Sequence, residues 1–185
     1  MSEPPVPTAR YESYSHEAMA AEVERDNDPV AAGEAGARWD GLAKRLHEST
    51  ADLAALIASS EENWRGGGGD AARAALGRAA RWLSHSAAVS ASVGSSIGAQ
   101  ADTAARARAD MPPPVPYDPA SMIRDAASSG NVLVLAGLAD EMAARRAEAE
   151  AARQKAIDVL RTRDTALRGQ VPAESFPAPP ALGQA

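Results

Sequence analysis

The stretch Glu61–Ala75, EENWRGGGGDAARAA, decides how the chain is organised, because four consecutive glycines separate two runs that both have the composition of helices. A glycine inside a helix costs about 1 kcal/mol relative to alanine. The four glycines are therefore predicted to form a turn, with Trp64 at its edge and Asp70 as the N-cap of the next helix. The sequence thus predicts a helical hairpin with WRGGGGD as its loop.

Apolar and small residues recur at seven-residue spacing on both sides of this loop, as in helices that pack along one another. Val30 to Asn63 and the run from Asp70 onwards are predicted to be long helices whose seams face each other. A third long run, Val132 to Arg168, repeats the pattern. The residues predicted to form the seam or core are Trp39, Leu42, Leu46, Leu53, Leu56, Leu76, Trp82, Leu83, Val93, Ile97, Leu135, Leu138 and Met142.

Shorter segments precede and follow the hairpin. A short helix is expected from Tyr14, and Asp28 is expected to cap the following helix, with a proline at its first position. The prolines of Met111–Pro119 exclude a helix there and predict a second turn. Another short helix then starts at Pro119, and Gly130 is a candidate for its C-cap.

The expected organisation is a flexible Pro-rich arm (1–12), a helical domain (13–169) and a Pro/Ala-rich tail without a core of its own (170–185). Aromatic residues make up only 4 % of the chain although 45 % is apolar, so small side chains dominate and favour close helix contacts. The predicted fold is all-α. It is an elongated helical bundle built on a long antiparallel αα-hairpin, with a third long helix and short accessory helices.

Residues that carry chemistry do not form a recognisable site. The chain has no cysteine, and its histidines (His16, His47 and His85) lie apart, without acidic or histidine neighbours at ligand spacing. Ser86 next to His85 lacks the strand-to-helix elbow of a nucleophile. The glycine run lacks the Lys-Ser/Thr pair of a phosphate-binding loop. We therefore expect a non-enzymatic protein without a metal or cofactor.

Charge and hydropathy limit the partners. The net charge of −6 comes without a basic stripe, which argues against nucleic-acid binding. No apolar run is long enough to cross a membrane, and the first residues lack the basic and apolar regions of a signal peptide. Export, if it occurs, is expected to be independent of a cleaved signal peptide.

Several motifs together resemble the PPE family of actinobacterial type VII (ESX) secretion. Trp64 and Gly66 form a W-x-G turn between two long helices, the signature of substrates of this pathway. ARWDGLAKRL (residues 37–46) upstream and Trp82-Leu83 downstream match the order of tryptophan motifs in PPE domains. The layout also resembles that of the related EspB-like secretion substrates, and the resemblance extends from about Ser13 to Leu167.

The resemblance implies a non-catalytic protein that is exported as a heterodimer with a PE-like or WXG100-like helical protein. The W-x-G turn, Trp64 and Gly66, would then form part of a composite signal read by the secretion ATPase. It also implies a chaperone that binds the tip of the domain, at positions matching Met111, Val115, Met122 and Ile123. The protein would be cytoplasmic before export and then secreted or at the cell surface.

Departures from the family leave alternatives open. The Pro-Pro-Glu of the family name is reduced to two prolines in SEPPVP, and Tyr11, Tyr14 and Tyr117 lack the acidic residue four positions later that completes the general export signal. One alternative is an EspB-like protein that forms a homo-oligomeric ring or pore. Another is the N-terminal export domain of a longer toxin. For Trp64, the alternative is a ring that only plugs the end of the bundle.

Overall fold

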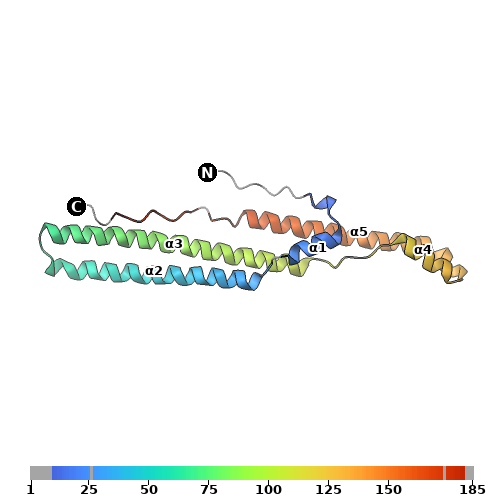
Figure 1. Ribbon diagram of the computed structural model, residues 1–185, viewed down its shortest axis with the longest axis horizontal. Helices are drawn as coiled ribbons and strands as arrows, with labels where there is room; N and C mark the ends of the chain where they lie inside the picture. Colours follow the sequence, from blue (N-terminus) through green and yellow to red (C-terminus); the bar gives the residue numbers. More distant parts are fainter. Residues whose placement is uncertain (1–9, 26, 173, 182–185) are drawn as a thin grey trace. The chain divides into compact units, whose positions relative to one another are not determined.

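The computed structural model describes residues 10–25, 27–172 and 174–181, and every regular element in these ranges is a helix (Figure 1). The predicted all-α class is confirmed. The elements, in chain order, are the 3₁₀ helix η1 (Tyr11–Ser13), α1 (His16–Glu24), α2 (Pro29–Asn63), α3 (Gly67–Asp110), α4 (Pro119–Ser128) and α5 (Val132–Arg168).

The chain forms two compact units. Unit 1 comprises Met1–Asn27 and Thr103–Leu167, and unit 2 comprises Asp28–Asp102 and Arg168–Ala185. The long helix α3 contributes to both, because the boundary falls within it. Unit 2 is therefore the α2–α3 hairpin with the C-terminal segment, whereas unit 1 combines the N-terminal segment with the end of α3, α4 and most of α5.

Two helices begin at the same Asp-Pro sequence. The side chain of Asp28 accepts a hydrogen bond of 3.0 Å from the backbone N–H of Ala31 at the start of α2, which confirms the predicted N-cap. Asp118 accepts hydrogen bonds from the N–H groups of Ala120 and Ser121 at the start of α4. In each case the following proline occupies a first-turn position, where its missing N–H has no helical partner to lose.

Helices α2 and α3 lie antiparallel and side by side in unit 2 (Figure 1). Almost all of the buried residues of this hairpin are small. They are Gly36, Ala43 and Ser60 of α2, and Ser86, Ala87, Val89, Ser90, Gly94 and Ala101 of α3. Small residues allow the two backbones to approach closely, so the contact strip is narrow.

The larger seam residues flank this narrow strip. Most of those predicted for unit 2 are half-buried: Trp39, Leu42, Leu46, Leu53, Leu76, Trp82, Leu83, Val93 and Ile97. The prediction is wrong for Leu56, which is exposed in this chain. Two helices alone bury only the strip along which they meet, and Leu56 lies beside that strip.

The glycine run differs from its prediction. Helix α3 begins at Gly67, so of the four glycines only Gly66 is outside the helix, where it has a φ of 90°. The backbone N–H of Asp70 donates to the carbonyl of Gly66 (3.2 Å), which makes Asp70 a first-turn residue and not the N-cap. Its carboxylate there still interacts favourably with the positive end of the helix dipole.

Unit 1 has the only cluster of large buried side chains among the described residues. Its members come from η1, α1, α3 and α5: Tyr11, Met19, Val23, Ala107, Ala156, Ile157 and Leu160. Met111 and Val159 pack against this cluster. The packed region thus begins at Tyr11, a residue that the sequence assigned to the arm, while residues 1–9 of that arm lie outside the described part of the chain.

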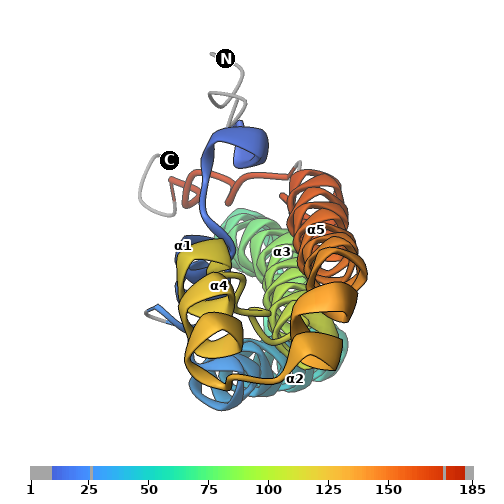
Figure 2. The ribbon, with the colours of Figure 1, turned by 90° about the vertical axis from the view of Figure 1, so that its right-hand side faces the viewer.

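Helix α4 packs beside the beginning of α5 within unit 1 (Figure 2). Gly130 joins them in the left-handed conformation, with a φ of 64°, as expected for a residue that ends a helix. The side chain of Asn131 then accepts a hydrogen bond from the N–H of Leu133 (3.0 Å) at the start of α5. Leu138 and Met142 are half-buried, but the prediction is wrong for Leu135, which is exposed because α4 covers the side of α5 that carries Leu138.

Candidate partner-binding surfaces

The W-x-G turn is held by a single arginine. Arg73 Nη1 donates to the carbonyl oxygen of Trp64 (2.7 Å) and to that of Ser60 (3.4 Å), both at the C-terminal end of α2. A cation there complements the negative end of the helix dipole. Asp70 forms an ion pair with the same guanidinium, so three groups from the two helices meet around the turn.

The indole of Trp64 remains accessible although its backbone is fixed. The backbone N–H of Trp64 donates to the carbonyl of Ser60 (2.9 Å), and 46 % of the residue is exposed. Gly69 is needed behind it, because a Cβ at that position would overlap the carbonyl group of Trp64. The turn therefore presents an apolar ring on a rigid backbone, which favours display over a plug at the bundle end.

The C-terminal segment lies along the hairpin in unit 2. The ring of Phe176 contacts the ring of Trp39, with centroids 5.9 Å apart, and Trp82 Nε1 donates to the carbonyl of Pro177 (3.0 Å). Further along α3, Ser96 and Gln100 both donate to the carbonyl of Gln170. Two of the three tryptophans are thus in contact with a segment that the sequence predicted to have no core of its own.

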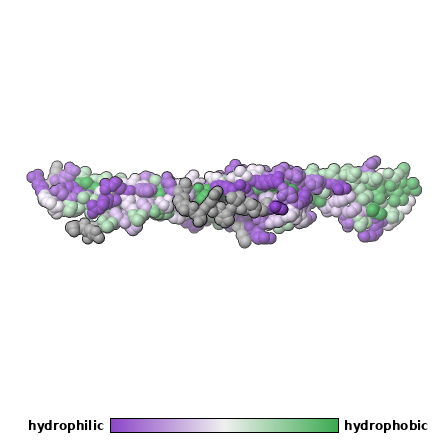
Figure 3. All heavy atoms as spheres, turned by 90° about the horizontal axis from the view of Figure 1, so that it is seen from above, coloured by the Kyte–Doolittle hydropathy of each residue, from purple (hydrophilic) through white to green (hydrophobic). Residues whose placement is uncertain are grey.

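An apolar end is formed in unit 1 by Ile123 of α4 and residues 132–135 at the start of α5. Leu133 is 81 % exposed and Ile123 is 51 % exposed, and the other three members are exposed as well. Figure 3 shows apolar residues gathered where α4 and the first turns of α5 lie. An exposed group of large aliphatic side chains of this kind marks an interaction surface.

The four residues suggested for chaperone binding do not lie on one surface. Met122 and Ile123 both lie on α4, where Met122 lines a shallow cavity with Val134 and Leu138 of α5. Val115 is half-buried in another hollow, beside His16. Met111 is also half-buried and packs against the large buried cluster of unit 1. Only Ile123 of the four belongs to the apolar end.

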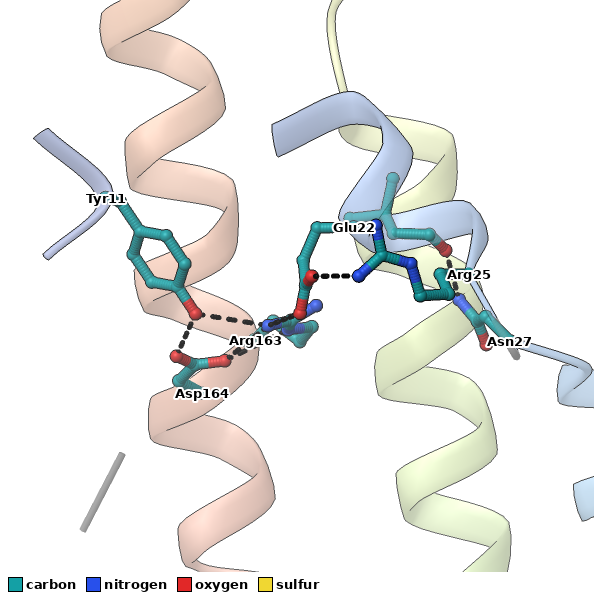
Figure 4. A network of polar contacts seen from close by, with 7 residues as sticks. Tyr11, Glu22, Arg25, Asn27, Arg163 and Asp164 are labelled. Carbon is teal, nitrogen blue, oxygen red and sulfur yellow. Dashed lines mark hydrogen bonds and ion pairs between the residues drawn. The ribbon is translucent and has the colours of Figure 1, made fainter. Parts of the chain in front are cut away.

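A polar network attaches the N-terminal segment to α5 in unit 1 (Figure 4). The hydroxyl of Tyr11 donates to Asp164 and accepts from Arg163 Nη2 (3.1 Å), and Arg163 also pairs with Glu22 of α1 (3.8 Å). Burial, followed by the hydrogen bond to Asp164, raises the pKa of Tyr11 to about 12. Burial alone would lower the pKa of Arg163, but the hydrogen bond and charge of Asp164 raise it.

The described residues contain no group of three or more histidine and carboxylate side chains that could hold a metal ion. Within the same ranges, none of the helices has the length and apolar character that a membrane span requires.

The sequence model of the PPE family matches residues 10–162. The chain belongs to the PPE family. The matched region comprises η1, α1, α2, α3, α4 and most of α5, so the W-x-G turn and the apolar end are both inside it. The C-terminal segment that lies on the hairpin is outside it. No curated protein matches the sequence.

Membership of this family associates the protein with ESX secretion systems. The PPE family is a secreted, non-enzymatic family whose members typically pair with PE proteins. The larger half-buried seam residues of α2 and α3 form an apolar stripe on the hairpin. Like the exposed Trp64 and the apolar end, this stripe is a place where apolar side chains are accessible.

Several contributors to these surfaces were missed by sequence reasoning. Arg73 looks like an ordinary charged residue in an alanine-rich helix, because nothing local shows that its partner is a carbonyl group across the turn. The docking of Phe176 had a weak signal, as it is the only phenylalanine of the chain and lies among prolines. The exposure of residues 132–134 was signalled by an apolar run without polar alternation.

Proposed function

We propose that this PPE protein is exported by a type VII system as a heterodimer with a PE-like or WXG100-like helical protein. The partner packs along the α2–α3 hairpin, and the W-x-G turn with Trp64 forms part of a composite signal for the secretion ATPase. The protein is cytoplasmic until it is exported. The single observation that carries the proposal is the half-buried apolar stripe of the hairpin.

The stripe has the properties of one side of a helical bundle. The two helices meet through glycine, alanine and serine, which leaves leucines at both flanks only partly covered. Burial of apolar surface contributes about 25 cal/mol per Å². A second helical hairpin that packs over these leucines would bury the apolar surface that they expose in this chain, and this burial would favour association. An amphipathic helix in such a groove is a common mode of protein recognition.

The rigid turn supports the composite signal. Because Arg73 contacts the carbonyl of Trp64 and Gly69 leaves room for it, the backbone that carries the ring is fixed, which lowers the ordering cost when another protein binds it. Large aromatic residues often dominate the binding energy of interfaces. The exposed indole is therefore suited to recognition together with residues supplied by the partner.

The apolar end supports a secretion chaperone as a second partner. Its five residues are exposed and continuous with the half-buried Met122. In this proposal the chaperone covers Ile123 and residues 132–135, and Met111 and Val115 take no direct part because both are turned into hollows or the core of unit 1.

Leu56 allows a direct test of the heterodimer. It is a predicted seam residue that is exposed in this chain, so Leu56→Asp should leave the hairpin folded, whereas a partner helix over the seam would have to bury the new charge. The matched control is Ala55→Asp, at a neighbouring exposed position outside the seam. The measurement is co-expression with a PE-like helical protein from the same genome, followed by size-exclusion chromatography with light scattering.

We expect a stable 1:1 complex for the original chain and for Ala55→Asp, and loss of the complex for Leu56→Asp with unchanged circular dichroism. A monomer that is well behaved on its own and forms no complex with the co-expressed helical protein would overturn the proposal. A defined ring of this chain alone would favour the EspB-like alternative.

A further inference from the structure

The C-terminal segment, of which residues 170–172 and 174–181 are described, contacts part of the hairpin. From Gln170 to Pro177 it follows α3 in the reverse direction, first beside Gln100 and Ser96 and then beside Trp82. Ser96 and Trp82 are fourteen residues apart, which corresponds to about 21 Å of α-helix at 1.5 Å per residue. Seven residues at about 3.1 Å each, the rise of an extended proline-rich chain, span about the same length, so the number of residues between the two contacts fits this path.

The contacts have the chemistry by which proteins bind proline-rich segments. Trp82 donates its indole N–H to the carbonyl of Pro177, and Trp39 provides an aromatic surface for Phe176. Extended proline-rich peptides dock in aromatic-lined grooves in this way, because they lose little conformational entropy on binding. Between Trp82 and Ser96, on the same side of α3, Val89 is almost completely buried.

The occupied face overlaps the predicted seam. Trp39 belongs to the same seven-residue track of α2 as Leu46 and Leu53, and Trp82 directly precedes Leu83 of the α3 seam. A helix laid along this seam and the extended segment would need the same space around the two tryptophans. The segment is also outside the region that matches the PPE family.

We propose that residues 170–181 are an internal competitor for the hairpin. They cover the Trp39 and Trp82 face in the free protein and leave it when a helical partner packs there. This inference rests on the proposed function for the identity of the competing partner. Docking of the segment itself does not depend on any partner and is measured separately.

The test uses the full-length chain with Phe176→Ala, which removes the ring contact to Trp39. Val171→Ala is the matched control, since it truncates an exposed apolar side chain of the same segment. In a Trp64→Phe background the fluorescence reports only on Trp39 and Trp82, because the chain has three tryptophans. We expect Phe176→Ala to increase acrylamide quenching of this fluorescence and Val171→Ala to leave it unchanged.

Partner affinity is then measured with Trp64 intact, by calorimetric titration with the PE-like helical protein used in the co-expression test. If the segment occupies the face in about 90 % of molecules, its release raises the apparent affinity about tenfold. We expect this gain for Phe176→Ala and not for Val171→Ala.

The outcomes separate the two proposals. Unchanged quenching in Phe176→Ala would show that the segment is not docked and would overturn the inference. Increased quenching with unchanged partner affinity would overturn the competition while leaving the heterodimer intact. If no variant binds the helical protein, the proposed function fails and the competition fails with it, whereas the quenching still reports the docking.

Discussion

Gly36 of α2 and Gly94 of α3 lie face to face in unit 2. A Cβ atom added to either glycine would come within 3.0 Å of the carbonyl oxygen of the other, so backbone meets backbone at this crossing. Only glycine permits this approach. The two helices therefore meet backbone to backbone at a point where neither has a side chain.

This crossing predicts opposite effects of the same substitution at neighbouring glycines. Gly33→Ala and Gly98→Ala should stabilise the protein by about 0.5–1 kcal/mol, because alanine favours the helix and nothing lies within 4 Å of the new methyl group. Gly36→Ala and Gly94→Ala should instead destabilise it by about 1–3 kcal/mol, because one backbone must move. Urea denaturation measures both, and equal gains at all four positions would contradict the close crossing.

The glycine run predicts a similar contrast within one turn of α3. Gly69→Ala should destabilise the protein, since its methyl group would overlap the carbonyl of Trp64, whereas Gly68→Ala should be neutral or stabilising. Gly66→Ala should also destabilise, because a φ of 90° is strained for alanine. Thermal unfolding followed by circular dichroism checks the order, and a more stable Gly69→Ala variant would show that the turn has another conformation.

Trp64→Ala separates a signal from a structural role. With nearly half of the residue exposed, truncation should cost less than the 3–5 kcal/mol that is typical of a buried tryptophan. We expect unchanged helicity, an intact complex with the partner and loss of export in a secretion assay. Trp39→Ala is the comparison, since it removes a half-buried ring that contacts Phe176 and should also perturb the hairpin. Normal export of Trp64→Ala would leave the turn without a signalling role.

Tyr11 predicts a specific dependence on alkaline pH. Its pKa is raised from 10.0 to about 12 in the folded protein, so its contribution to stability is fully present below pH 10 and is lost as the pH rises towards 12. Ultraviolet titration of tyrosinate should show one late-ionising tyrosine that disappears in Tyr11→Phe. The late component should persist in Tyr14→Phe. Its persistence in Tyr11→Phe would assign it to another residue.

The apolar end predicts a binding defect without a folding defect. Leu133→Ser should leave the unfolding temperature nearly unchanged, because the side chain is 81 % exposed, and should weaken pull-down of the secretion chaperone. Ala136→Ser, at a nearby exposed position of α5 outside the apolar end, is the control. Equal chaperone binding by both variants would remove the apolar end from this interface.

The long helices were predictable because their signals are local. The bounds of α5, and the start of α2 to within one residue, follow from the heptad spacing, the Asp-Pro cap at Asp28 and the glycine at position 130. The start of α3 was missed because propensity penalises glycine everywhere in a helix. At Gly69, the need for space beside Trp64 outweighs that penalty.

The surfaces were only partly predictable because they depend on contacts between distant residues. Trp64 was identified from its motif, but the role of Arg73 depends on where the end of α2 faces α3. Periodicity also marks residues as apolar on one face without showing whether this chain covers that face, which is why Leu56 and Leu135 are exposed. The proline-rich segment has no periodicity, so its position on the hairpin left no pattern in the sequence.

The bond from Tyr11 to Asp164 has a consequence for how the protein is made. Unit 1 joins residues separated by 153 positions. The N-terminal segment therefore cannot form its contacts with α5 until nearly all of α5 has been synthesised. The α2–α3 hairpin needs only contacts between its own neighbouring halves and is complete much earlier. A helical partner present during translation would therefore meet a finished hairpin before residues 170–181 have left the ribosome.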